Sequence, residues 1–404
     1  KYAGSVLQWE EHLSAVRDRR PRPRISPAVI LRAVAVMFLS RLGSLNALEQ
    51  TRPSRFWRGW LRERMPSADS IGRVCAVMEV DDLRNLQQAL YTRLKRMKAL
   101  QPPSHGLMAA IVDGHESHAT FRRHCDGCLQ RVIHTEQGDR IQYYHRHVAL
   151  ELIGHDLRMM LDAEPLRPGE DEVTAALRLL ERVLTAYPRA FDVVLADALY
   201  ARSPFFNYLA KHGKDVLAVL KDERRDLLED ARALIEQTAP VSERDGACRR
   251  TCWDIEGFTS WPQVQAPVRV VRSLETRTIR RQLTRQDEEV RSDWVWVTTL
   301  PAARASTGAV VQLGHSRWSI ENHGFNELVN RWHADHVYKH QATAILVFCL
   351  IAMICLNVFI AFYRRNIKPA ARRAASMLHM AGQIAAELRR PGAPRSIDLG
   401  CDSS

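Results

Sequence analysis

The spacing of apolar residues changes along the chain and first predicts a helical region. Up to about residue 100, apolar side chains recur every three or four positions, which is the period of an amphipathic helix. Helices are predicted over PAVILRAVAVMFLSRLGSLNAL (27–48), PSADSIGRVCAVM (66–78) and DDLRNLQQALYTRLKRMKAL (81–100). Ser67 is the expected N-cap of the second helix. We predict an all-helical, basic domain over 1–100 and a linker at QPPSHG, 101–106.

From residue 107 to about 221 the pattern becomes that of an α/β domain. Strands are expected at LMAAIV (107–112), ending at Asp113, at IQYYHRHVALELI (141–153) and at LRMMLDAEPL (157–166). A helix at 170–187, a strand in FDVVLADALY ending at Asp197, a helix near 203–213 and a strand at 215–221 follow. Three strands, helix, strand, helix and strand predict a mixed α/β sheet with flanking helices.

Two further regions complete the chain. Residues 222–312 read as a β-rich insertion, with strands at 247–258, 267–279 and 292–300. Helical patterning returns over 313–388, and 389–404 reads as a tail. Ala342 to Phe362 are uncharged and long enough to span a bilayer. Because nothing else in the chain is membrane-like, we favour a buried core helix and expect no membrane partner.

Composition and charge narrow the class of protein. The 404 residues are 46% hydrophobic and 26% charged, which is ordinary for a folded protein of two or three domains. A net charge of +12 from 58 Lys and Arg favours a polyanionic partner, nucleic acid before membrane. Eight cysteines do not make a secreted disulfide framework, and the first residues lack an apolar signal core. A reducing cytoplasmic setting is expected.

Three carboxylates stand out as candidate chemistry. Asp113 and Asp197 each follow a predicted strand, and Glu321 lies on a predicted helix in RWSIENHGF (317–325). Arg317 precedes Glu321 by four positions, the less favourable order for a helical ion pair, so the acid is expected to serve another purpose. Three converging carboxylates need a cation, and oxygen ligands suit Mg²⁺ or Mn²⁺. A pair of such ions would favour phosphoryl transfer. The alternative is that each of the three carboxylates is a solvated surface acid or a helix cap.

These motifs resemble those of an insertion-sequence enzyme family. IVDGHE (111–116), VVLADALY (193–200) and SRWSIENHGFNEL (316–328) resemble the segments that carry the acids of IS4-like DDE transposases. The resemblance spans about 107–363 and implies a ribonuclease H-like catalytic core, with 107–221 as its first part and 313–388 as its helical completion. It also implies that Asp113, Asp197 and Glu321 are the catalytic residues and bind Mg²⁺ or Mn²⁺.

The same resemblance implies DNA-contacting residues, with two departures from the family pattern. Arg317 would contact phosphate near the cleaved strand. Gly314 stands where a Tyr is usual, and Leu328 where a Lys or Arg is usual. The remaining candidate contacts are His315, Trp318, Asn322 and Arg331, where His315 and Arg331 would substitute for the missing side chains. Trp318 would stack on a base, with core packing as its alternative.

Two pairs of cysteines are candidates for a metal site. CDGC (125–128) has the spacing of half a zinc knuckle, His124 and His134 lie near, and Cys248 with Cys252 would complete four thiolates. Because the second pair has looser spacing and lies far along the chain, free thiols at Cys125 and Cys128 are favoured over structural zinc. His145 and His147 are expected on a sheet surface, and roles for Glu116, Asp162 and Glu164 stay open.

The resemblance implies a DNA transposase that cleaves element ends and joins the 3′-OH to target DNA. Residues 1–100 would recognise terminal inverted repeats, and two ends to be paired imply at least a homodimer. Its partners would be double-stranded repeat and target DNA, and its location the bacterial nucleoid. The alternatives are a catalytically inactive DNA-binding relic and a membrane-associated protein, for which the segment 342–362 would have to be exposed.

Overall fold

The computed structural model describes residues 2–221, 225–246 and 248–389, and it divides into two compact units. Unit 1 comprises residues 1–101, 114–187 and 321–404, and unit 2 comprises 102–113 and 188–320. Strand β1 (Ala109–Thr120) therefore begins in unit 2 and ends in unit 1. The predicted tail lies outside the described residues from residue 390 onward.

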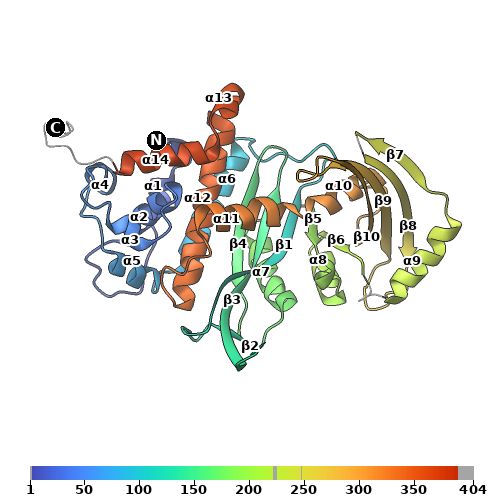
Figure 1. Cartoon of the computed structure of the whole chain (residues 1–404), viewed down its shortest axis with the longest axis horizontal. Helices are drawn as coiled ribbons and strands as arrows, with labels where there is room; N and C mark the ends of the chain where they lie inside the picture. The colour runs from blue at the N-terminus through green and yellow to red at the C-terminus, as the bar shows by residue number, and fades with distance from the viewer. Residues whose placement is uncertain (1, 222–224, 247, 390–404) are drawn as a thin grey trace. The chain divides into compact units, whose positions relative to one another are not determined.

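Short helices form the N-terminal part of unit 1 (Figure 1). They are η1 (Tyr2–Val6, a π-helix), α1 (Trp9–Ser14), α2 (Pro27–Leu39), α3 (Leu45–Glu49), α4 (Phe56–Leu61), α5 (Ala68–Cys75) and α6 (Val80–Arg96). The predicted cap is confirmed, since the Ser67 side chain accepts a hydrogen bond from the Ser70 amide. The predicted helix over 27–48 is instead two helices. Arg41 adopts a positive φ of 56° after α2, which interrupts the helical backbone.

Unit 1 also contains the strands that follow the linker. β2 (Leu129–Thr135) and β3 (Gly138–Ile153) form an antiparallel hairpin, and β4 (Arg158–Pro165) pairs with the other end of β3. The sequence pattern missed β2, whose side chains are mostly exposed and give little apolar signal. Helix α7 (Glu172–Ala186) packs its apolar face on β3 and β4.

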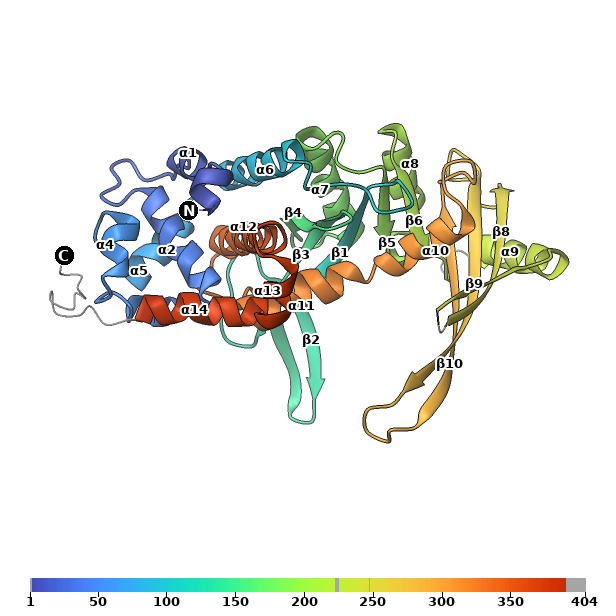
Figure 2. The same cartoon turned by 90° about the horizontal axis from the view of Figure 1, so that it is seen from above.

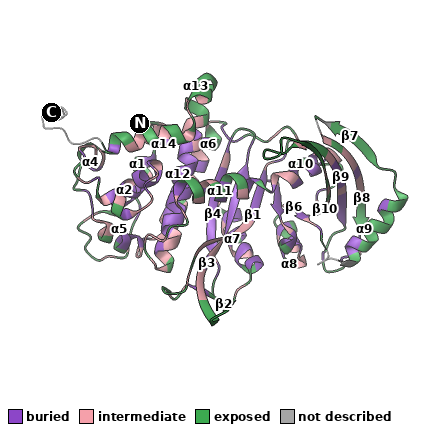
Figure 3. Ribbon diagram, in the orientation of Figure 1, coloured by how far each residue is buried: buried purple, intermediate pink, exposed green. Residues whose placement is uncertain are grey.

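The long apolar segment forms α12 (Ala342–Asn366), a buried helix of unit 1 (Figure 3). It packs against β4 and against α2, α5 and α6, and 78% of its most apolar stretch is buried. Its one buried amide, Asn357, bonds to both the N–H and the carbonyl of Met160 in β4. The prediction of a core helix is confirmed, because the apolar surface is covered by protein.

Unit 2 is built on a mixed sheet of strand order β1-β5-β6-β10-β9-β8-β7. β1, β5 (Val193–Ala196) and β6 (Asp215–Val219) are parallel, and β10 (Asp287–Thr298) pairs antiparallel with β6. β9 (Val268–Arg280) and β8 (Cys248–Phe258) continue the sheet (Figure 2). β7 (Val241–Asp245) pairs with β8. The insertion thus extends the core sheet. Its helix α9 (Arg225–Gln237) and strand β7 were not predicted, although Leu227, Ala231 and Ile235 of α9 are buried at helical spacing.

The remaining helices complete both units. α8 (Ser203–Lys211) and α10 (Thr307–Ser316) belong to unit 2, and unit 1 contains α11 (Asn326–Trp332), α13 (Pro369–Ala374) and α14 (Met377–Arg389). A parallel core of strands linked by helices, with antiparallel strands added, is the mixed α/β, ribonuclease H-like arrangement that was expected.

Candidate active site

Asp113 and Asp197 come to the same edge of the sheet of unit 2. β1 and β5 are parallel neighbours, with Ala109 opposite Val193 and Ile111 opposite Leu195. The same register, continued by two residues, places Asp113 level with Asp197 along the sheet. Both strands are buried up to these acids. The sequence therefore anchors two carboxylates where the apolar strands leave the core, although β1 itself continues beyond Asp113 to Thr120.

Asp197 has a local structural task as well. Its Oδ1 accepts a hydrogen bond of 2.9 Å from the Leu199 amide, which caps the short 3₁₀ helix η2 (Ala198–Tyr200). A carboxylate has two oxygens with several acceptor positions, so this cap leaves capacity for a cation. The helix-cap interpretation of Asp197 is thus true, and it does not exclude a metal-binding role.

Arg317 lies against Asp113 within unit 2. Its Nη1 donates to Oδ2 of Asp113 over 3.4 Å, and only 6% of Arg317 is exposed. The guanidinium also stacks on Trp318, with 4.2 Å from its Cζ to the ring centroid. Trp318 itself is 40% exposed, so it is not a core residue. The arrangement puts a buried positive charge directly beside a candidate metal-binding carboxylate.

Glu321 lies in an unusual helical turn. The predicted regular helix through RWSIENHGF is not present, since α10 ends at Ser316 and residues Ile320–Phe325 form a π-helix, η4. Glu321 is in the first turn of η4, in unit 1, and is partly buried. π-turns are rare and occur frequently at functional sites. The wider turn also means that the α-helical spacing of Arg317 and Glu321 does not place them on one regular face.

The first departure from the family pattern has a steric reason. A Cβ at Gly314 would lie 2.4 Å from the indole of Trp296, so no larger side chain fits there. The neighbouring His315 forms a hydrogen bond of 2.6 Å between its Nε2 and Oε1 of Glu275. Burial alone would raise the pKa of Glu275, but the bond and charge of His315, together with Arg250 and Ser273, outweigh burial and lower that pKa. His315 is therefore engaged by an acid within unit 2.

The other candidate DNA contacts lie in unit 1. Asn322 is exposed, and Arg331 is about half exposed and pairs with Glu327 one helical turn earlier. Leu328, at the second departure, is buried in α11. Asn322 and Arg331 are thus accessible from solvent, whereas position 328 is part of the core.

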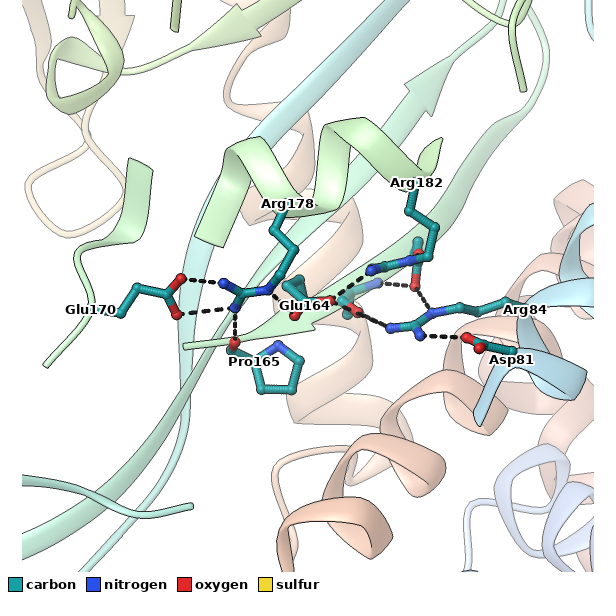
Figure 4. Close-up of polar contacts among 9 residues, drawn as sticks. Asp81, Arg84, Glu164, Pro165, Glu170, Arg178 and Arg182 are labelled. Atoms are coloured by element: carbon teal, nitrogen blue, oxygen red, sulfur yellow. Dashed lines mark hydrogen bonds and ion pairs between the residues drawn. The ribbon is translucent and has the colours of Figure 1, made fainter. Parts of the chain in front are cut away.

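Three further acids, Glu116, Asp162 and Glu164, form ion pairs in unit 1. Glu116 pairs with Arg131. Asp162 and Glu164 on β4 are buried and form ion pairs with arginines of α6 and α7. Figure 4 shows Arg178 and Arg182 reaching from α7 and Arg84 from α6. These contacts give Asp162 and Glu164 a structural role that joins three elements.

A family model described as a transposase DDE domain matches residues 106–358 of the chain. None of the curated proteins compared with the chain matches it. The matched range contains Asp113, Asp197, Arg317 and Glu321, together with all the strands of both units.

Proposed function

The chain belongs to the transposase DDE domain family, whose model covers more than half of its length, and from this premise we propose that it is an IS4-like DNA transposase. It cleaves the ends of a DNA element and joins the freed 3′-OH to target DNA. In the first step water attacks a phosphodiester, the bond from phosphorus to the 3′ oxygen breaks, and a 3′-OH is released. In the second step that 3′-OH attacks a target phosphodiester in the same way.

One observation carries the proposal. The parallel register of β1 and β5 supports two carboxylates at adjacent positions of one sheet edge, which is an oxygen donor set that suits Mg²⁺ or Mn²⁺. Asp113 and Asp197 would hold the ions together with Glu321. When bound, two ions would supply Lewis-acid activation of water and stabilise the leaving oxygen. Glu321 is proposed as the third ligand from its place in the motif.

Arg317 is proposed to orient Asp113. Its burial and its bond to Asp113 favour this role over that of an exposed phosphate contact. A guanidinium beside a carboxylate holds its oxygens in a fixed direction and offsets charge repulsion between neighbouring acids. Trp318, Asn322 and Arg331 are accessible and remain the candidates for contact with DNA. His315 is proposed to contact DNA only after its hydrogen bond to Glu275 is broken.

The rest of the molecule supports a DNA partner. The net charge of +12 favours binding to a polyanion, and we propose that the helices of residues 1–100 recognise terminal inverted repeats. Two element ends must be brought together, so we expect a homodimer on repeat DNA, measurable by light scattering. A chain of this kind would work in the cytoplasm, at the nucleoid.

The test is cleavage of DNA that carries the gene's native flanks, with Mg²⁺ or Mn²⁺ against metal-free buffer. Asp113→Asn and Glu321→Gln are expected to bind this DNA without cutting it. Glu116→Gln is the matched control, because Glu116 lies on the same strand as Asp113 and pairs with Arg131. It is expected to cut like the wild type.

Two outcomes would overturn the proposal. If the wild type binds the flanks and never cuts with either metal, the chain is a DNA-binding relic of a transposase. If Asp113→Asn and Glu321→Gln cut as well as the wild type, the active site lies elsewhere.

A further inference from the structure

Four metal-ligating side chains meet in unit 1, apart from the acids described above. They are Cys125, Cys128, His145 and His340, whose ligand atoms all lie within 4.8 Å of one another. The two cysteines lie between β1 and β2, His145 is on β3, and His340 comes just before α12. The sequence pointed to the CDGC pair with other candidate partners, and it missed His340, which is 212 residues from Cys128.

We propose that these four residues bind one structural Zn²⁺. Two thiolates and two imidazoles are a common donor set for zinc. Four protein ligands fill a tetrahedral shell, so no position stays open for water or substrate, and the site is structural rather than catalytic. This replaces the sequence-based preference for free thiols, and Cys248 and Cys252 are not needed to complete the site.

The distances fit a tetrahedral ion. Metal–ligand bonds of about 2.3 Å to sulfur and 2.0–2.1 Å to nitrogen imply separations of about 3.8 Å between sulfurs and about 3.5 Å between sulfur and nitrogen. The Sγ atoms of Cys125 and Cys128 are 3.9 Å apart. His145 Nε2 lies 3.4 and 3.2 Å from them, and His340 Nε2 lies 3.4 Å from Cys128 Sγ. A disulfide needs about 2.05 Å between sulfurs, so the geometry favours a metal.

The surroundings hold the ligands in this arrangement. The Cys125 amide donates to Cys128 Sγ at 3.3 Å, and the Cys128 amide donates to the Cys125 carbonyl at 3.0 Å. An N–H directed at sulfur stabilises a thiolate. Gly127 is required by close packing, since a Cβ there would lie 2.8 Å from the Ala342 methyl. The CDGC loop thus packs closely against the first turn of α12.

His145 was expected on a sheet surface, and that interpretation is wrong, because the residue is buried. The ion would tie the CDGC loop and β3 to the start of α12, which is the central helix of unit 1.

The first experiment measures metal in the reduced, full-length chain purified without chelators. We expect inductively coupled plasma mass spectrometry to find one zinc ion per chain. Replacement by Co²⁺ should give the absorption bands of a tetrahedral ion with thiolate charge transfer. A reduced chain that holds no stoichiometric zinc and gives no cobalt spectrum would overturn the site, as would a Cys125–Cys128 disulfide in the native protein.

Variants then locate the ion. His340→Gln and Cys128→Ser are expected to weaken zinc binding by more than about 100-fold, since loss of an outer partner alone costs 10- to 100-fold. His134→Gln and Cys248→Ser are the controls and should keep one zinc. His340 is only partly buried, so its variant is expected to fold even if Cys128→Ser does not. Retention of zinc by His340→Gln would contradict the proposal. Metal content is the readout, so the result is independent of DNA cleavage.

Discussion

At the scale of single residues, contacts decide which side chains a position accepts. Gly314 and Gly308 are both in α10, but only Gly314 faces an obstacle, the Trp296 indole. The sequence shows two equivalent glycines, and only the packing distinguishes them.

The first prediction compares these two glycines. Gly314→Ala should lower the free energy of unfolding by about 1–3 kcal/mol, because an added methyl group overpacks a filled site. Gly308→Ala should leave it unchanged or raise it by up to about 1 kcal/mol, because Ala favours a helix. Urea unfolding followed by tryptophan fluorescence measures both. Equal effects of the two changes would show that Trp296 moves aside freely.

The second prediction separates the two tasks of Asp197. Asparagine caps helices as well as aspartate, so Asp197→Asn should change the free energy of unfolding by less than about 0.5 kcal/mol. It should nevertheless reduce metal-dependent cleavage by at least about 100-fold, because a neutral amide is a poor ligand for Mg²⁺. Urea unfolding and cleavage rates are compared on the same preparation. Full cleavage by Asp197→Asn would contradict a metal-binding role for Asp197 and support only its role as the cap of η2.

At the scale of elements, buried ion pairs join helices to the sheet. Asp162 on β4 accepts from Arg84 Nε at 3.2 Å and from Arg182 Nε at 2.6 Å. The carboxylate is buried, and both arginines are mostly covered. Removing it leaves Arg84 and Arg182 with Glu164 as a shared carboxylate in place of two, and the uncompensated positive charge is costly in a low dielectric.

The third prediction uses this pair of contacts. Asp162→Ala should lower the free energy of unfolding by about 2–4 kcal/mol, slightly less than for a fully buried pair because the arginines keep some solvent. Asp81→Ala is the control, since Asp81 pairs with the same Arg84 but is largely exposed. It should cost no more than about 0.5 kcal/mol. Urea unfolding measures both, and similar costs would mean that burial of Asp162 contributes nothing.

At the scale of the whole molecule, stability should depend on pH through paired carboxylates in both units. Burial acts to raise the pKa of Glu170 in unit 1 and of Glu275 in unit 2. Hydrogen bonds and neighbouring positive charges, foremost those of Arg178 for Glu170 and of His315 for Glu275, together outweigh burial, so both pKa values are lowered. Below its unfolded pKa, near 4.3 for Glu, the unfolded chain takes up a proton that the folded chain resists. This stabilisation is therefore present above that pH and is lost as pH falls through the folded pKa.

Loss of this stabilisation at low pH can be tested at Glu170. Glu170→Gln should be less stable than the wild type near pH 7, and the difference should shrink as the pH falls below about 4. Glu181→Gln, an exposed change on α7, should stay parallel to the wild type at every pH. Urea unfolding at a series of pH values measures the three curves. A difference for Glu170→Gln that is constant with pH would contradict the assigned ion pair with Arg178.

The sequence alone determined most elements and the place of two candidate acids. Period and capping identify α5, α6 and α7, and the apolar runs before Asp113 and Asp197 identify β1 and β5, because each element carries its own pattern of buried residues. It missed β2, whose residues are mostly exposed, and it missed β7 and α9, which lie in the segment predicted to be β-rich.

Only the tertiary structure decided which distant residues meet. It directed Arg317 onto Asp113, set Trp296 against Gly314, and gathered His145 and His340 with the CDGC loop. It also replaced the expected α-helix around Glu321 by a π-turn. Local patterns report the period of a strand or helix, whereas contacts across hundreds of residues depend on how those elements pack, which no local pattern encodes.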